Sequence, residues 1–93
     1  MEDRITIEKI HKYRDLTSRA LKIAKRSIEK GKEPRGKEII EMVSNYLSDS
    51  EYFEKKEDFI NAFAALNYAH GWLDSGARLG VFDVKDDRFF TVK

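Results

Sequence analysis

The sequence predicts an all-α fold, an up-down-up bundle of three helices followed by a short C-terminal apolar tail. Apolar residues recur at spacings of three and four in three long segments, as they do along one face of a helix. Only one proline occurs, and a content of 38% charged and 41% apolar residues suits helices with solvated outer faces. Short connections imply antiparallel neighbours. We expect one domain over residues 1–93, with helices at about 6–30, 36–55 and 58–79 and the tail over 81–93.

The first predicted helix begins after a polar cap and ends near residue 30. Thr6 or Asp3 supplies a side-chain oxygen that can accept from the free amides of the first turn. Gly31 suits the left-handed residue that follows a helix, and Pro34 prevents continuation. The apolar face consists of Ile10, Tyr13, Thr17, Ala20, Leu21, Ala24 and Ile28.

The second predicted helix covers about residues 36–55. The Ser-Asp-Ser stretch at 48–50 weakens its second half, because these side chains compete for backbone hydrogen bonds. We expect the helix to continue through them, because Phe53 stays in phase with the apolar face. That face consists of Ile39, Ile40, Val43, Tyr46, Leu47, Ser50 and Phe53.

The third predicted helix is expected to be the most buried. Asp58 is a good N-cap, and Gly80 suits the terminating position. Gly71 and Gly76 each cost roughly 1 kcal/mol inside a helix relative to alanine. They therefore indicate the close approach of a neighbouring helix, a partner or a ligand. The main apolar stripe is Phe59, Ala62, Phe63, Leu66, Ala69, Leu73 and Ala77.

The C-terminal tail is apolar around an acidic pair at residues 86–87. Its aromatic rings are expected to be covered rather than solvated. Three arrangements would cover them: closure of the open end of the bundle, a short extended pair, or docking on a second subunit. The apolar residues are Val81, Phe82, Val84, Phe89, Phe90 and Val92.

Charge is unevenly distributed along the chain. Residues 1–37 contain 12 Lys/Arg and 6 Asp/Glu, whereas residues 38–93 contain 6 and 11. A basic half is typical of proteins that bind nucleic acid, and equally of a basic helix that lies beside acidic ones. The candidate nucleic-acid face on the first helix is Lys12, Arg19, Lys22, Arg26 and Lys30.

Composition also limits the chemistry and the location. Cysteine is absent, which excludes disulfides, thiolate metal sites and cysteine nucleophiles. The charged stretch after Met1 reads as neither a signal peptide nor a membrane span, so we expect a cytoplasmic protein with no membrane partner. Glu8 and His11 have the spacing found in di-iron bundles, but the second such pair is missing. We expect no metal and no cofactor.

A line of polar residues follows one flank of the third helix. The imidazole of His70 and the carboxylate of Asp74, one turn later, suit an oriented general base or two ligands of a binding site. The structural alternative is a hydrogen-bonded seam in which Asn67 and His70 contact the first helix. The line consists of Asn67, His70, Asp74 and Arg78.

Two aromatic residues of the third helix lie off its main stripe. Tyr68 and Trp72 are one turn apart. If they are exposed, they form an anchor for a partner helix or a second copy of the chain; if they are buried, they belong to the core. Phe89 and Phe90 of the tail could extend such a surface.

A string within the third helix identifies a family resemblance. The string is Asn67-Tyr68-Ala69-His70-Gly71-Trp72-Leu73-Asp74, with Tyr46 and Phe53 upstream. It resembles the signature of a small archaeal family catalogued as domain of unknown function 357, over about residues 7–82. The resemblance implies a helical-bundle fold and an archaeal, cytoplasmic setting. It implies no activity, and a fold alone supplies none.

The sequence therefore predicts first a non-enzymatic module for protein interaction or self-association. The first alternative is a nucleic-acid-binding accessory domain that uses the basic face of the first helix. The second is a small-ligand or enzymatic site around His70 and Asp74. The candidate binding residues are Asn67, Tyr68, His70, Trp72, Asp74 and Arg78.

Overall fold

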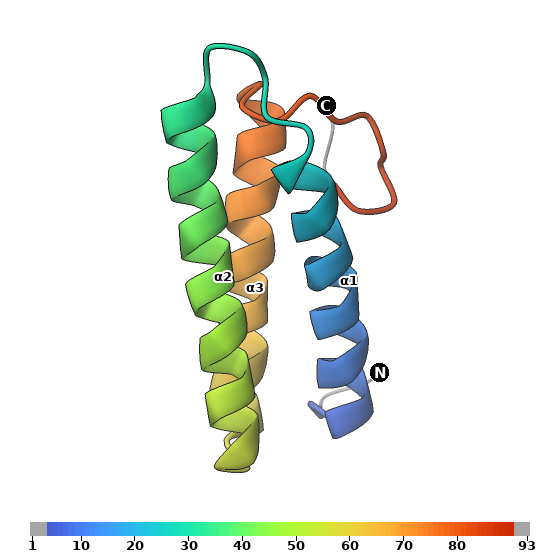
Figure 1. The fold of residues 1–93 in the computed structure, drawn as a ribbon. Helices are drawn as coiled ribbons and strands as arrows, with labels where there is room; N and C mark the ends of the chain where they lie inside the picture. The colour runs from blue at the N-terminus through green and yellow to red at the C-terminus, as the bar shows by residue number, and fades with distance from the viewer. Residues whose placement is uncertain (1–3, 91–93) are drawn as a thin grey trace.

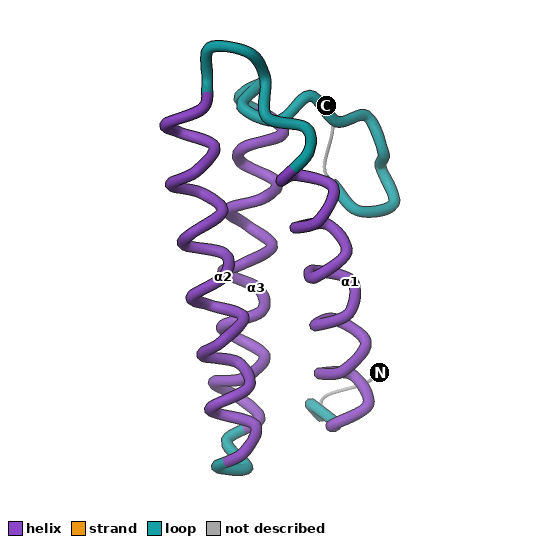
Figure 2. The backbone as a smooth tube through the Cα atoms, in the orientation of Figure 1, coloured by secondary structure: helices purple, strands orange, loops and turns teal. Residues whose placement is uncertain are grey.

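The computed structural model describes residues 4–90 and confirms the three-helix bundle (Figures 1 and 2). The helices are α1 (Ile7–Lys25), α2 (Glu33–Lys55) and α3 (Phe59–Arg78). The chain runs up, down and up, and α3 packs against both other helices. The molecule is elongated, with extents of 41 × 26 × 16 Å. None of the helices in the described part of the chain combines the length and hydrophobicity needed to cross a bilayer.

Helix α1 begins as predicted but ends earlier. The Thr6 hydroxyl oxygen accepts from the Lys9 amide at 3.1 Å, whereas Asp3 lies outside the described residues. The helix stops at Lys25, so the prediction of an end near residue 30 was wrong. The reason is tertiary: the backbone after α1 hydrogen-bonds to the C-terminal segment. The Asp83 amide donates to the Ser27 carbonyl at 2.7 Å, and the Glu29 amide donates to the Val81 carbonyl at 2.8 Å.

Helix α2 begins slightly earlier than predicted and is continuous. Pro34 lies in its first turn, where a missing amide costs nothing. Gly31 has φ +90° and lies in the linker rather than directly after α1. Residues 48–50 do not break the helix, and the Ser50 hydroxyl donates to the Leu47 carbonyl at 2.7 Å within it.

Helix α3 has the predicted limits. The Asp58 carboxylate accepts from the Asn61 amide at 3.1 Å, so Asp58 caps the start. Arg78 is the last helical residue, and Gly80 follows with φ +77°. Both signals are local to the sequence, which is why they could be read from it.

The main cluster of the core lies at the end of the bundle that the C-terminal segment closes. Phe82 and Phe90 are buried, and Ile28 and Phe82 form an isolated antiparallel bridge. The tail therefore closes the end of the bundle and pairs with the linker, two of its three predicted arrangements; Val92 lies outside the described residues. The main cluster is Ala20, Leu21, Ala24, Ile39, Val43, Ala69, Leu73, Val81, Phe82 and Phe90, and a smaller one is Ile10, Ala62 and Leu66.

Candidate functional site

The outer face of α3 is apolar, exposed and almost free of charge. From Phe59 to Leu73 the helix contains no Asp, Glu, Lys or Arg, although such residues make up 38% of the chain. Three large hydrophobic residues on α3 or its C-cap are among the most exposed: Ile60 at 73%, Tyr68 at 63% and Leu79 at 74%. Exposed apolar residues that gather on one face of a small protein often mark an interaction site.

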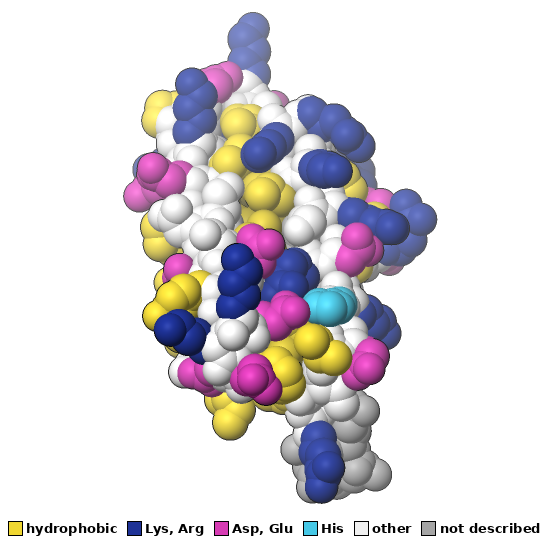
Figure 3. Space-filling view, turned by 60° about the horizontal axis from the view of Figure 1, so that its bottom comes forward, with side chains coloured by type: hydrophobic (Ala, Val, Ile, Leu, Met, Phe, Trp, Pro, Cys, Tyr) yellow, Lys and Arg dark blue, Asp and Glu magenta, His cyan; other side chains and the backbone are white. Residues whose placement is uncertain are grey.

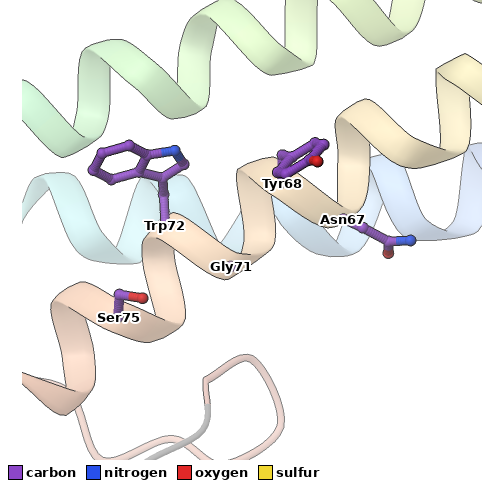
Figure 4. A pocket seen from close by; sticks show the side chains of 5 residues that line it. All are labelled: Asn67, Tyr68, Gly71, Trp72 and Ser75. Atoms are coloured by element: carbon purple, nitrogen blue, oxygen red, sulfur yellow. The ribbon is translucent and has the colours of Figure 1, made fainter.

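A shallow hollow of about 350 Å³ lies at the middle of this face. Figure 4 shows Tyr68 and Trp72 projecting from one side of α3, with Gly71 between them and no side chain to fill the gap. The lining residues are Asn67, Tyr68, Gly71, Trp72 and Ser75. We call this surface, together with Ile60, Ala64 and Leu79, the α3 face.

The two aromatic residues differ in their setting. The Tyr68 ring stacks on Tyr46 of α2, with centroids 5.5 Å apart and 23° between the planes. Because this contact already restricts the exposed ring, binding of a partner would cost little further side-chain entropy. Trp72 is half-buried against the main core cluster. Tyr68 thus supplies the exposed anchor, and Trp72 supplies one wall of the hollow.

The two glycines of α3 have opposite surroundings. A Cβ atom at Gly76 would lie 2.5 Å from Cε2 of Phe82, so the ring of the C-terminal segment explains that glycine. Apart from its chain neighbours and the nearby backbone of α3, a Cβ atom at Gly71 would meet no atom of residues 4–90 within 4 Å. The fold therefore gives no reason for a helix-weakening glycine at position 71.

His70 links α3 to α1. Its Nδ1 lies 3.2 Å from the Thr17 hydroxyl, and its Nε2 lies 3.7 Å from the Asp74 carboxylate. The order hydroxyl, imidazole, carboxylate resembles a nucleophile with its base and orienting acid. Thr17 borders the groove between α1 and α3 but is only 1% exposed, so its oxygen is scarcely accessible to a substrate in this arrangement. The geometry supports the structural alternative for His70.

The remaining members of the polar line do not join this seam. Asn67 is exposed and lines the hollow, and it also lines a groove of about 330 Å³ beside His70, between α1 and α3. The predicted contact between Asn67 and α1 is therefore not formed by a side-chain hydrogen bond within residues 4–90. Arg78 is exposed in the last turn of α3.

The predicted basic face does not lie on one helix. Lys12, Arg19 and Lys22 are on α1, but Arg26 is its C-cap and Lys30 lies in the linker. Arg19 pairs with Asp15 at 3.1 Å, which neutralises the centre of the stripe. Figure 3 shows acidic and basic side chains interspersed on one face of the molecule. The early end of α1 is the cause of this difference.

A charged cluster between α1 and α2 was missed by the sequence reasoning. Arg14 contacts Glu54 and also donates to the Ser50 hydroxyl at 3.1 Å, while His11 donates to Glu54 at 2.8 Å. The hydrogen bond from His11, and then that from Arg14, lower the pKa of the Glu54 carboxyl. The pairing spans some forty residues, so no local pattern reveals it.

The described residues offer no metal centre. Across residues 4–90, no three His, Cys, Asp or Glu side chains lie close enough together to hold an ion. The Glu8–His11 pair is not part of such a group within residues 4–90, and His11 contacts the Glu54 carboxylate.

Together these features define a small helical-bundle domain in which the exposed face of α3 is almost free of charge. Residues 12–82 match the family model described as "Protein of unknown function (DUF357)", and the chain belongs to this family. Neither the comparison with curated proteins nor that with solved structures gave a match. The family assignment agrees with the resemblance read from residues 67–74 and adds no activity.

Proposed function

We propose that this protein is a non-enzymatic interaction module that binds an α-helix on its α3 face. The observation that carries the proposal is Gly71: it weakens an exposed helix, and no packing contact within residues 4–90 requires it. A glycine on an open helix face permits another backbone to approach closely. The hollow between Tyr68 and Trp72 would then receive a side chain of the partner helix.

The chemistry of the α3 face suits a helix rather than a charged ligand. The centres of protein interfaces are depleted in charge and enriched in aromatic residues. Tyrosine and tryptophan are the residue types that most often dominate binding energy, and both border the hollow. The sequence suggested that Phe89 and Phe90 of the tail could extend this surface. Phe90 does not extend it, because its ring is buried in the core.

Photo-cross-linking tests the proposal even though the partner is unidentified. The full chain is purified with p-benzoylphenylalanine in place of Tyr68, added to an extract of native cells and irradiated. We expect a discrete adduct whose cross-linked peptide is helical and can be identified by mass spectrometry. The partner identified in the adduct is then purified, and its binding to the chain is measured. Ser75→Arg, which places a charge on the α3 face, should abolish that binding.

Two matched controls make the result specific. Tyr52 is an exposed tyrosine on α2, at 57%, and the probe at that position should give no adduct. Ser48 is an exposed serine on α2, and Ser48→Arg should leave binding unchanged. Absence of any adduct from position 68, or equal adducts from positions 52 and 68, would show that the α3 face is not an interaction surface.

A second candidate function is nucleic-acid binding. In its favour, Lys12, Lys22, Arg26 and Lys30 are exposed and form no ion pair within residues 4–90. They are spread over one helix and the linker after it, so they offer separate phosphate contacts rather than a continuous stripe. A titration with RNA distinguishes this function from the first.

We propose a cytoplasmic location, and the archaeal setting is carried only by the family resemblance. Fractionation of native cells with an antibody to the chain would test the location: recovery in the soluble cytoplasmic fraction is expected, and recovery with membranes or in the medium would contradict it.

A further inference from the structure

We propose that the helix bound on the α3 face is α3 of a second copy of this chain, packed antiparallel about a two-fold axis. This inference rests on the proposed function and specifies its partner. Closed two-fold dimers are the commonest oligomers, and their interface requires a surface that complements itself. The α3 face meets that requirement in shape, in hydrophobicity and in charge.

Residue order along α3 makes the face complementary to itself in shape. We place the two-fold axis midway between Ala69 and His70. Each residue of α3 then faces the partner residue that lies equally far from the axis along the partner's α3. Tyr68 then faces the partner's Gly71, so the exposed ring enters the gap that no internal side chain fills. The same register places Ala64 opposite the partner's Ser75, two small residues that permit close helix packing.

The apolar ends of the face match in this register. Ile60 faces the partner's Leu79, and these are the two most exposed large hydrophobic residues within residues 4–90, at 73% and 74%. Each would lose contact with water on one side, and removing apolar surface from water is favourable. One register therefore covers both exposed ends and the central ring.

Charge agrees with the antiparallel direction. The middle of α3 carries no Asp, Glu, Lys or Arg, so two copies meet without repulsion. Arg78 lies in the last turn, while Glu57 and Asp58 precede the first turn. In the proposed register Arg78 faces the partner's Asn61, one turn from the partner's Asp58. A parallel arrangement would bring like charges together at both ends.

The size of the face indicates a weak dimer. Helix α3 has 20 residues, and a helix of that length is about 30 Å long. A strip about 10 Å wide along it covers less than the roughly 800 Å² per partner of a standard interface. We therefore expect a Kd in the micromolar range, and a monomer at nanomolar concentration.

Sedimentation equilibrium of the full chain is the first test. The average mass should rise from 10.9 kDa toward twice that value as the concentration passes through the micromolar range. Ser75→Arg should weaken the dimer at least tenfold, whereas Ser48→Arg on α2 should not. Gly71→Ala should also weaken it while the monomer stays folded. A chain that remains monomeric up to millimolar concentration would overturn the proposal.

Cysteine cross-linking tests the register. The chain has no cysteine, so an introduced thiol is the only one present. Ala64→Cys mixed with Ser75→Cys should form a disulfide-linked pair on mild oxidation. Ala64→Cys alone should not, because positions 64 and 64 of two copies lie about 16 Å apart in this register. Efficient cross-linking of Ala64→Cys with itself would show parallel packing and contradict the proposal.

The two proposals fail in different ways. If the probe at position 68 captures another protein and the chain stays monomeric, the interaction function stands and self-association falls. If position 68 captures this same chain, both stand. If it captures nothing and the chain stays monomeric, both fall.

Discussion

At the scale of single residues, internal packing explains one of the two glycines of α3 and leaves the other for function. Gly76 leaves room for the ring of Phe82, and its need is internal. Gly71 faces open space, so its replacement should help the isolated fold. We expect Gly71→Ala to raise the free energy of unfolding by about 0.5–1 kcal/mol, because alanine loses less backbone entropy in a helix. Urea unfolding followed by the fluorescence of Trp72, at nanomolar concentration, measures the monomer.

Gly76→Ala is the matched substitution, five residues further along the same helix. Its Cβ would lie 2.5 Å from Phe82 Cε2 and 3.1 Å from Ile39 Cδ1, both in the core. Overpacking of this kind costs typically 1–3 kcal/mol. The two variants should therefore shift unfolding in opposite directions. A loss of stability in Gly71→Ala would mean that position 71 is needed by the fold itself.

Glu54 should make stability depend on pH in a defined window. Hydrogen bonds from His11 and Arg14 lower its pKa in the folded state from the ordinary value of 4.5. Because the folded pKa is the lower one, the stabilisation is complete above about pH 4.5 and is lost as pH falls through the folded pKa. Glu54→Gln should cost about 1 kcal/mol at pH 7, an amount typical of partly exposed ion pairs.

Chemical denaturation of both proteins from pH 7 to pH 3 checks this expectation. The difference in unfolding free energy should shrink as the pH falls, since a protonated glutamate resembles glutamine. Glu51→Gln serves as the control, because Glu51 is exposed on the same helix and forms no ion pair within residues 4–90. A gap between wild type and Glu54→Gln that stays constant over the range would exclude an electrostatic origin.

At the scale of elements, the C-terminal segment acts as a structural part of the bundle although it is not helical. Its buried rings fill the upper end of the core, and its backbone bonds to the linker after α1. We expect Phe82→Ala to lower the free energy of unfolding by about 3–5 kcal/mol, since Phe82 is only 1% exposed. A domain of this size has only about 5–14 kcal/mol in total.

Phe89→Ala provides the comparison for this experiment. Phe89 is half-buried, and its ring lies 5.5 Å from the Arg88 guanidinium. Its removal should cost clearly less than removal of Phe82. Thermal unfolding of the three proteins gives the order directly. Equal, small losses for both variants would show that the segment does not close the bundle in solution.

The elements also show which boundaries a sequence can give. Asp58 and Gly80 mark the ends of α3 through local capping, and both were predicted. The end of α1 was not, because Ser27 and Glu29 exchange helical hydrogen bonds for bonds to Asp83 and Val81, more than fifty residues away. Local propensity is a weak guide wherever tertiary pairing competes with it.

The candidate site was predictable to the same extent. Tyr68 and Gly71 were singled out by their helical phase and residue type, and the structure places both on the α3 face. The exposure of Ile60 and Leu79 was missed, although the uncharged run that precedes Asp74 was a visible signal. That His70 contacts Thr17 depends on how α1 packs, which residue type alone does not fix.

At the scale of the whole molecule, the basic and acidic halves of the chain lie against each other. The basic first half supplies His11 and Arg14, and the acidic second half supplies Glu54, which they contact. Glu29 in the linker and Glu33 at the start of α2 lie among the basic residues there. The net charge of +1 therefore produces no large positive field. This arrangement favours shielding over a phosphate-binding surface.

Binding to RNA should accordingly be weak and should disappear at physiological salt. Each phosphate contact releases counterions, so affinity carried by several lysines and arginines falls steeply as salt rises. Fluorescence anisotropy of a labelled single-stranded RNA, titrated at about 20 mM and 150 mM salt, measures this dependence. Lys22→Glu together with Lys30→Glu is the charge-reversal control. Submicromolar binding at the higher salt that is lost in this variant would assign the function to the basic residues instead of α3. A helix face with almost no charge cannot account for RNA binding that depends on Lys22 and Lys30.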